Sequence, residues 1–204
     1  MKHYAHRVLV AAILGLLTIS GFAQEKKHWS TTTVYSQSHH SAISTDLITW
    51  GWFGTANAEI STAIAKKVVL FTGGRYNNWS FNNNSLEEPV LQQQATINAG
   101  IKWYQWYNYS GLFFGFKTQY EAYRKGGVFH KDYTEEGDAF GFGAGVGYSI
   151  MLWKNCNLDL GLWGWGGSTS YEGFSREYKG KSIEKGVRGF ISPDDVLVSL
   201  VYVF

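Results

Sequence analysis

The sequence predicts an all-β protein: an eight-stranded antiparallel up-and-down transmembrane β-barrel that follows a cleaved signal peptide. Three observations predict it, namely a short apolar N-terminus, period-two alternation along most of the chain, and an unusual composition. Aromatic residues make up 17% of the 204 residues and glycine accounts for 24, against 2 prolines and 1 cysteine. This composition is too apolar for a disordered chain, too rich in glycine for a helical one and too poor in cysteine for a disulfide scaffold.

Residues 1–23 have the pattern of a secretory signal peptide. Lys2 and Arg7 supply the positive start, the apolar run Val8–Ile19 follows, and Ala23 precedes the expected cleavage point. The run is too short for a membrane-spanning helix, which needs about 20 residues. Cleavage removes two of the 18 Lys and Arg residues and leaves 16, equal to the 16 Asp and Glu. A neutral mature chain has no electrostatic footprint for nucleic acid, so we expect no such partner.

Residues 24–40 are polar and have no hydrophobic period, which is typical of a flexible periplasmic lead-in. His28, His39 and His40 fall in this segment. Solvated side chains are favoured over a metal site there, because metal ligands must converge in a fixed geometry. The remaining residues, 41–204, have the length of a single barrel domain.

The first four expected strands differ in how clearly they alternate. They span Ile43–Phe53, Asn57–Ile64, Val68–Trp79 and Gln94–Trp103. The fourth has the cleanest pattern, with polar residues between the apolar positions Ala95, Ile97, Ala99, Ile101 and Trp103. Most of the eight expected strands have about the 9–11 residues that a tilted membrane-spanning strand needs.

The last four expected strands span Leu112–Glu121, Ala139–Leu152, Leu158–Tyr171 and Asp195–Phe204. In the sixth strand one face is nearly bare, because it consists mainly of Gly141, Gly143, Gly145 and Gly147. Glycines that face a narrow barrel interior leave room for long side chains opposite. The last strand ends in alternating apolar residues that resemble the C-terminal insertion signal of bacterial outer-membrane barrels: Val198, Leu200, Tyr202 and Phe204.

The connections between these strands alternate in length. Short turns are expected at Ala65–Lys67, Tyr107–Tyr109 and Trp153–Asn157, and longer loops at Ser80–Pro89, Arg124–Asp138 and Glu172–Asp194. The connection Gly54–Ala56 breaks this rule because it is tight. Short turns at one end and long loops at the other are typical of outer-membrane barrels. The charged loop at 172–194 is the favoured contact surface for a partner, because exposed loops commonly carry function.

A soluble β-sandwich also alternates, but its exposed face should be rich in charge. Only 17% of this chain is charged, against about 25% in typical soluble domains. Aromatic residues also gather near the expected strand ends, where membrane interfaces would place them. A secreted soluble barrel that binds a small apolar ligand stays as the alternative.

Four segments of the chain resemble a known family: Thr45–Ser61, Gly111–Val128, Glu136–Ser149 and the ending DDVLVSLVYVF. They resemble the family catalogued as domain of unknown function 3575, small outer-membrane barrels of Gram-negative bacteria. The chain departs from the family pattern at Trp50–Phe53 and at Thr55–Asn57. The resemblance implies an OmpA-like eight-stranded barrel in the outer membrane, in contact with lipid and with the barrel-assembly machinery. The resemblance implies no known chemistry. It does imply an accessory role beside surface or fimbrial proteins.

Alternation also places charged side chains inside the barrel, where an unpaired charge is costly. We expect a lumenal charge network in which carboxylates pair with cations: Glu59, Glu121 and Asp159 with Arg75, Lys102 and Lys117. Asp46 is expected to face the same interior. The favoured interpretation is structural filling of the lumen, and the alternative is a narrow gated conduit.

No catalytic residue, cofactor or metal site is predicted. A serine hydrolase would need a histidine beside its nucleophile, and no histidine of the mature chain lies in an expected strand. A lipid-modifying enzyme that uses His130 with Asp132 is the less favoured alternative. We expect a protein without enzymatic activity.

Overall fold

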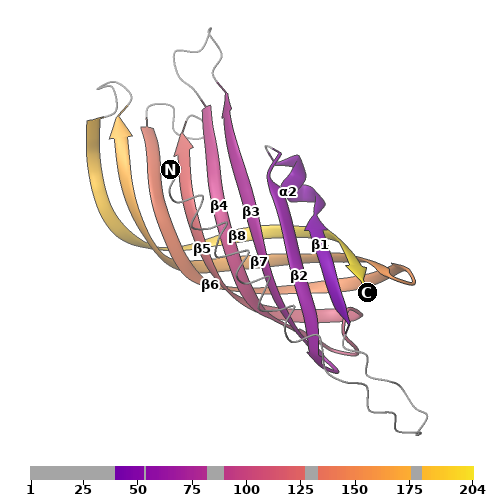
Figure 1. The fold of residues 1–204 in the computed structure, drawn as a ribbon. Coiled ribbons are helices and arrows are strands. Elements are labelled where there is room, and N and C mark those ends of the chain that lie inside the picture. The colour runs from indigo at the N-terminus through magenta and orange to yellow at the C-terminus, as the bar shows by residue number, and fades with distance from the viewer. Residues whose placement is uncertain (1–39, 53, 82–89, 127–132, 176–180) are drawn as a thin grey trace, which may run out of the picture.

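The computed structural model describes residues 40–52, 54–81, 90–126, 133–175 and 181–204. Eight antiparallel strands are hydrogen-bonded in chain order, and β1 pairs with β8 to close a ring (Figure 1). The predicted all-β class, strand number and up-and-down order are confirmed. The expected signal peptide, the lead-in up to residue 39 and His130 lie outside the described residues.

Most strands extend further than the sequence predicted. Their bounds are β1 Ser41–Asp46, β2 Ala56–Ala65, β3 Val68–Phe81, β4 Val90–Tyr104, β5 Gly111–Gly126, β6 Tyr133–Trp153, β7 Cys156–Ser175 and β8 Lys181–Val203. The expected loops at 124–138 and 172–194 are wrong, because most of both ranges continues the β5–β6 and β7–β8 ladders. Polar residues occupy both faces there, so the alternation fades while the backbone hydrogen bonds continue.

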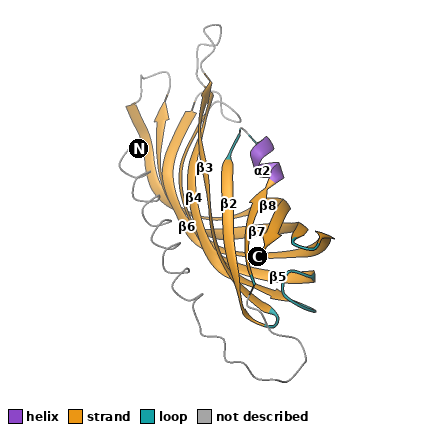
Figure 2. Cartoon of the chain, turned by 45° about the vertical axis from the view of Figure 1, so that its right-hand side comes forward, coloured by secondary structure: helices purple, strands orange, loops and turns teal. Residues whose placement is uncertain are grey.

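Strand β1 is shorter than predicted, because the short helix α2 (Leu47–Gly51) replaces the second half of the expected first strand (Figure 2). Asp46 causes the change. Its Oδ2 accepts a hydrogen bond from the Thr49 amide at 2.8 Å and caps α2. Its Oδ1 accepts a second bond, also at 2.8 Å, from the amide of Val198 on β8. One carboxylate therefore lies where β1 ends, caps α2 and accepts the hydrogen bond of one edge amide of β8, that of Val198.

Strand β8 is much longer than β1, so the two pair over only part of β8. We call the place where their pairing stops the seam of the ring. Strand β1 pairs with β8 only from Ser199 to Val203. From Lys181 to Val198, β8 pairs with β7 along one edge, and no described strand pairs with its other edge. Figure 1 shows β8, in yellow, lying along β1 near its C-terminal end and diverging from it towards the opposite end of the molecule.

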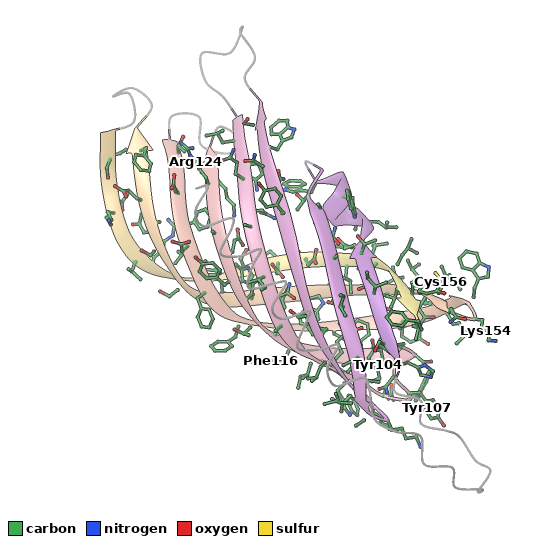
Figure 3. All side chains as sticks on the ribbon, viewed as in Figure 1. Tyr104, Tyr107, Phe116, Arg124, Lys154 and Cys156 are labelled. Atoms are coloured by element: carbon green, nitrogen blue, oxygen red, sulfur yellow. The ribbon has the colours of Figure 1, made fainter. Side chains whose placement is uncertain are left out.

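The short turns and both ends of the described chain lie at one end of the ring. Tyr107 and Lys154, from two of these turns, lie far from Arg124 near the other end of β5 (Figure 3). The Ser41 amide donates to the Phe204 carbonyl at 3.2 Å, which joins the start of β1 to the end of the chain. We call this the turn end and the opposite one the loop end.

The outer face of the ring is apolar. Every strand exposes large apolar side chains there, each at least 37% exposed, for example Ile43, Ile64, Leu70, Ile101, Phe114, Phe142, Leu162 and Leu200. The C-terminal residues Leu200, Tyr202 and Phe204 are exposed as well, and Val198 is half-buried. Polar and charged side chains are buried inside instead, among them Lys102, Lys117, Gln119, Glu121 and Asp159. Within the described residues, no helix has the length and apolar character needed to cross a membrane.

Candidate functional site

Three aromatic side chains fill the interior at the turn end. Tyr104 and Phe113 are almost completely buried, with ring centroids 5.3 Å apart, and Tyr109 packs beside Tyr104 at 6.0 Å. Tyr109 has a φ of 59°, so it lies in the left-handed region. Its carbonyl oxygen accepts hydrogen bonds from Asn157 Nδ2 at 2.6 Å and Ser149 Oγ at 3.1 Å. These bonds hold the turn inside the ring and close this end of the interior.

A first layer of charges lies beside the aromatic plug. Lys102 Nζ is 2.5 Å from Glu59 Oε1 and 4.9 Å from the centroid of the Phe71 ring. Asp159 is 2% exposed and interacts electrostatically with Lys102. Its Oδ1 has no hydrogen-bond partner among the described residues. The layer brings three of the predicted network residues together, with a lysine that offsets the cost of burying carboxylates.

An indole ring separates this layer from a second one. Trp163 lies over two glycines that pair in register, Gly115 and Gly145. A Cβ atom would lie 2.2 Å from the indole at Gly115 and 2.3 Å from it at Gly145. Phe71 meets Trp163 edge-on with centroids 5.9 Å apart, and Lys117 Nζ lies 5.0 Å from its centroid on a cation–π contact. The room left by the inward glycines is therefore taken by an indole as well as by charged side chains.

A β-bulge in β8 turns two consecutive carboxylates into the interior. Trp163 of β7 pairs with Asp195, whereas the next residue, Gly164, pairs with Pro193. Asp194 is thus the extra residue on β8, and a bulge of this kind re-aims side chains locally. Both carboxylate side chains are nearly buried, at 5% exposure for Asp194 and 10% for Asp195.

Two cations neutralise this carboxylate pair. Arg75 Nη2 is 2.5 Å from Asp195 Oδ2, and its Nη1 is 3.5 Å from Asp194 Oδ1. Lys117 Nζ donates to Asp194 Oδ2, and Gln119 Nε2 donates to Asp194 Oδ1 at 3.2 Å. The second layer is therefore neutral, and removal of one member would leave a buried charge without its partner.

Between this layer and the loop end lies a cavity of about 540 Å³. Its apolar wall includes Trp165 and Phe190, whose rings meet edge-on with centroids 4.6 Å apart. Residues of α2 and the bulged part of β8 line the side of the cavity at the seam. The volume falls in the range of small-molecule sites, about 300–1,000 Å³.

Two ion pairs line the same cavity. Lys125 Nζ lies 3.1 Å from Glu121 Oε1, and Arg188 Nη2 lies 2.7 Å from Glu135 Oε1. The Tyr123 hydroxyl also donates to Glu135 Oε1, at 2.6 Å. Both cationic side chains are about half exposed, at 46% for Lys125 and 52% for Arg188, so a ligand in the cavity could contact them.

A family model described as protein of unknown function (DUF3575) matches residues 27–204. The chain belongs to the DUF3575 family. This confirms the resemblance drawn from the sequence. Searches of the curated proteins and of the solved structures return no match to the DUF3575 chain.

The predicted charges of this DUF3575 chain divide into three groups. Glu59, Lys102 and Asp159 meet in the first layer, as described above. Arg75 and Lys117 meet in the second layer, although their partners are Asp194 and Asp195 rather than the predicted carboxylates. Glu121 forms its ion pair with Lys125 at the cavity, and it also interacts electrostatically with Arg75 of the second layer. Asp46 is buried as expected, and it acts as a cap for two backbone segments.

The predicted network lacked Asp194 and Asp195. Alternation from the end of β8 already placed Asp195 on the inner face, so that residue could have been included. The sequence predicts a loop at Asp194, and only the bulge brings this residue inside. Pro193 was the available signal, since proline within a strand indicates an edge or a bulge.

Proposed function

We propose that this DUF3575 protein is a non-enzymatic outer-membrane β-barrel of a Gram-negative bacterium, with a structural role or an accessory role in cell-surface structures such as fimbriae. The observation that carries the proposal is the apolar outer surface that runs over all eight strands. A continuous exposed apolar patch larger than a few hundred Å² is rare on a soluble monomer. A band of this kind that faces lipid is the defining surface of an outer-membrane barrel.

The positions of exposed aromatic residues support the same proposal. Trp103, Tyr107 and Trp153 are exposed at the turn end. Trp50 and Trp52 are exposed in and beside α2, towards the loop end. Amphipathic rings at both borders of an apolar band match the girdles that anchor barrels at the two membrane interfaces.

The closed turn end favours a structural or accessory role over a conduit. Buried aromatic rings and two charge layers occupy the interior between the turns and the cavity. In this proposal the apolar band contacts outer-membrane lipid, and the assembly machinery reads the C-terminal residues Val198, Leu200, Tyr202 and Phe204. Surface or fimbrial partners would meet the loop end, which faces outside.

Cell fractionation and site-specific labelling test this proposal together. The protein should be recovered in the outer membrane and run on gels with a mobility that changes on heating. In a Cys156→Ser background, a large impermeant maleimide should label Lys185→Cys on intact cells, and Lys154→Cys only after lysis, because Lys185 and Lys154 lie towards opposite ends of the ring. Recovery of a soluble periplasmic protein would support the secreted ligand-binding alternative and overturn the proposal.

A further inference from the structure

The seam between β1 and β8 borders the cavity. The residues that line this side are Ile48 and Trp52 of the α2 region and the β8 stretch that ends at Val196. On β8 this stretch belongs to the edge that pairs with no described strand. Ile191 and Val196 on the same stretch are 95% and 54% exposed, so the apolar outer band reaches the seam. The cavity thus meets the apolar exterior at the side of the ring.

The edge of β8 that pairs with no described strand carries features that disfavour the addition of another strand. Pro193 has no backbone N–H to offer a ninth strand. The bulge at Asp194 bends the edge, and the Asp46 carboxylate already occupies the Val198 amide. Helix α2 also contacts β8. Proteins use prolines, bulges and covering helices to keep strand edges from pairing, so these features favour an opening that stays unpaired.

The polarity of the site selects the orientation of a ligand. The inside of the cavity is charged, with the ion pairs Lys125–Glu121 and Arg188–Glu135 and the floor carboxylate Asp195. The lining residues on the seam side are mixed, but the large apolar ones among them, Ile48, Trp52 and Val196, are each exposed to the outside. An amphiphile would therefore place its polar head in the cavity and leave its chain against these apolar residues, in the surrounding lipid.

The balance of charges selects the type of head group. The described charged groups that line the cavity comprise three cations and four carboxylates: Arg75, Lys125 and Arg188, with Glu121, Glu135, Asp194 and Asp195. An excess of one carboxylate favours an ammonium group on the ligand. The half-exposed Arg188 and Lys125 are suited to a phosphate, which makes strong charge-assisted hydrogen bonds with such donors.

We propose that the cavity binds the zwitterionic phosphate-and-amine head group of a membrane amphiphile, which enters sideways through the seam between α2 and β8 while its acyl chain stays outside. The inference rests on the proposed function, since it needs a bilayer around the ring. A head group with both signs of charge can exchange contacts with the two ion pairs at the cavity. No covalent step is involved.

Binding is tested on the full mature protein in detergent, by native mass spectrometry with probes of equal chain length. Lysophosphatidylethanolamine should bind about tenfold more tightly than lysophosphatidylglycerol or monoacylglycerol. Glycerophosphoethanolamine, which has the head group alone, should bind more weakly than the intact lipid. Arg188→Gln and Lys125→Gln should each remove the preference, whereas Lys154→Gln at the turn end should keep it. Equal binding of all the lipids, or an unchanged preference in both cavity variants, would overturn the proposal.

Lateral entry is tested with a lysophosphatidylethanolamine that carries a diazirine on its chain. Adducts should concentrate on peptides that contain residues 47–52 and 191–198, and excess unlabelled lipid should compete them away. Adducts spread evenly over all eight strands would contradict a seated chain. If the protein is heat-modifiable and found in the membrane fraction but does not prefer lysophosphatidylethanolamine, this inference alone is overturned. If the protein is soluble, the proposed function is overturned.

Discussion

The Asp46 carboxylate accepts a hydrogen bond from the Val198 amide at 2.8 Å, across the point where β1 leaves the ring. Its other oxygen caps α2 through Thr49. On the opposite side, the Asn57 side chain makes two hydrogen bonds with the Asp46 backbone. Its Oδ1 accepts from the Asp46 amide at 2.6 Å, and its Nδ2 donates to the Asp46 carbonyl oxygen at 2.9 Å. The seam is therefore held by side chains where the backbone ladder stops.

Replacement of Asp46 should weaken this junction. Asp46→Ala removes the helix cap and leaves the Val198 amide without its acceptor, so we expect a loss of about 1–3 kcal/mol in the free energy of unfolding. Urea titration in detergent micelles measures it. Asp138→Ala is the control, because Asp138 is exposed and its carboxylate accepts a bond from the Tyr120 hydroxyl on the outer face. Equal stability of the Asp46→Ala variant and the wild type would contradict the role assigned to this carboxylate.

Gly145 should tolerate no side chain as long as Trp163 occupies its present position. A methyl group at residue 145 would meet the indole at 2.3 Å, and overpacking of this kind costs about 1–3 kcal/mol. Gly164→Ala is a matched control, since its nearest neighbour would lie at 3.7 Å. Thermal unfolding should show a lower midpoint for Gly145→Ala alone.

The same prediction has an internal check. Trp163→Leu is itself destabilising, because it leaves a cavity in the interior. In that background Gly145→Ala should cost less than it does in the wild type, since the clash has been removed. Additive effects of the two substitutions would show that the indole is not what excludes a side chain at residue 145.

Much of the fold could be predicted from the sequence, because alternation reports directly which face of a strand each residue occupies. The bare face of β6 and the inward positions of Lys102 and Lys117 follow from this period alone. The strand bounds were mispredicted where alternation no longer distinguishes a buried face from an exposed one. Polar residues on both faces hid the extensions of β5 to β8, and the Asp46 cap ended β1 within the weakly alternating segment Ile43–Phe53 that the sequence predicts as one strand.

The partners in the charge layers were harder to predict than their members. Alternation assigns a residue to a face of its strand. It does not give the residue's position between the turn end and the loop end, and that position decides which charged side chains meet. The bulge at Asp194 also shifts the parity of β8, so Asp194 and Asp195 face inward together. Because of this one-residue bulge in β8, Arg75 and Lys117 both pair with Asp194.

A cation on the outer face distinguishes a membrane barrel from a soluble one. Leu162 is 60% exposed on β7, so Leu162→Lys in a soluble protein should change the free energy of unfolding by less than about 0.5 kcal/mol. In a bilayer the same change should cost about 2–4 kcal/mol near the midplane. Folding into phospholipid vesicles measures the difference. Ser170→Lys, on the exposed face of the same strand nearer the loop end, should have a much smaller effect.

The interior should not conduct ions, because Tyr104, Tyr109 and Phe113 fill the turn end beyond both charge layers. We expect no step conductance in planar bilayers from the wild type, nor from Arg75→Ala or Glu121→Ala, since these substitutions leave the aromatic plug in place. Combined Tyr104→Ala and Phe113→Ala substitutions should give no step conductance either, because Tyr109, Trp163 and both charge layers still fill the interior; a heat-modifiable band checks that the variant is folded. Discrete channel openings in the wild type that disappear in Arg75→Ala would instead support a gated conduit and contradict the role of the plug.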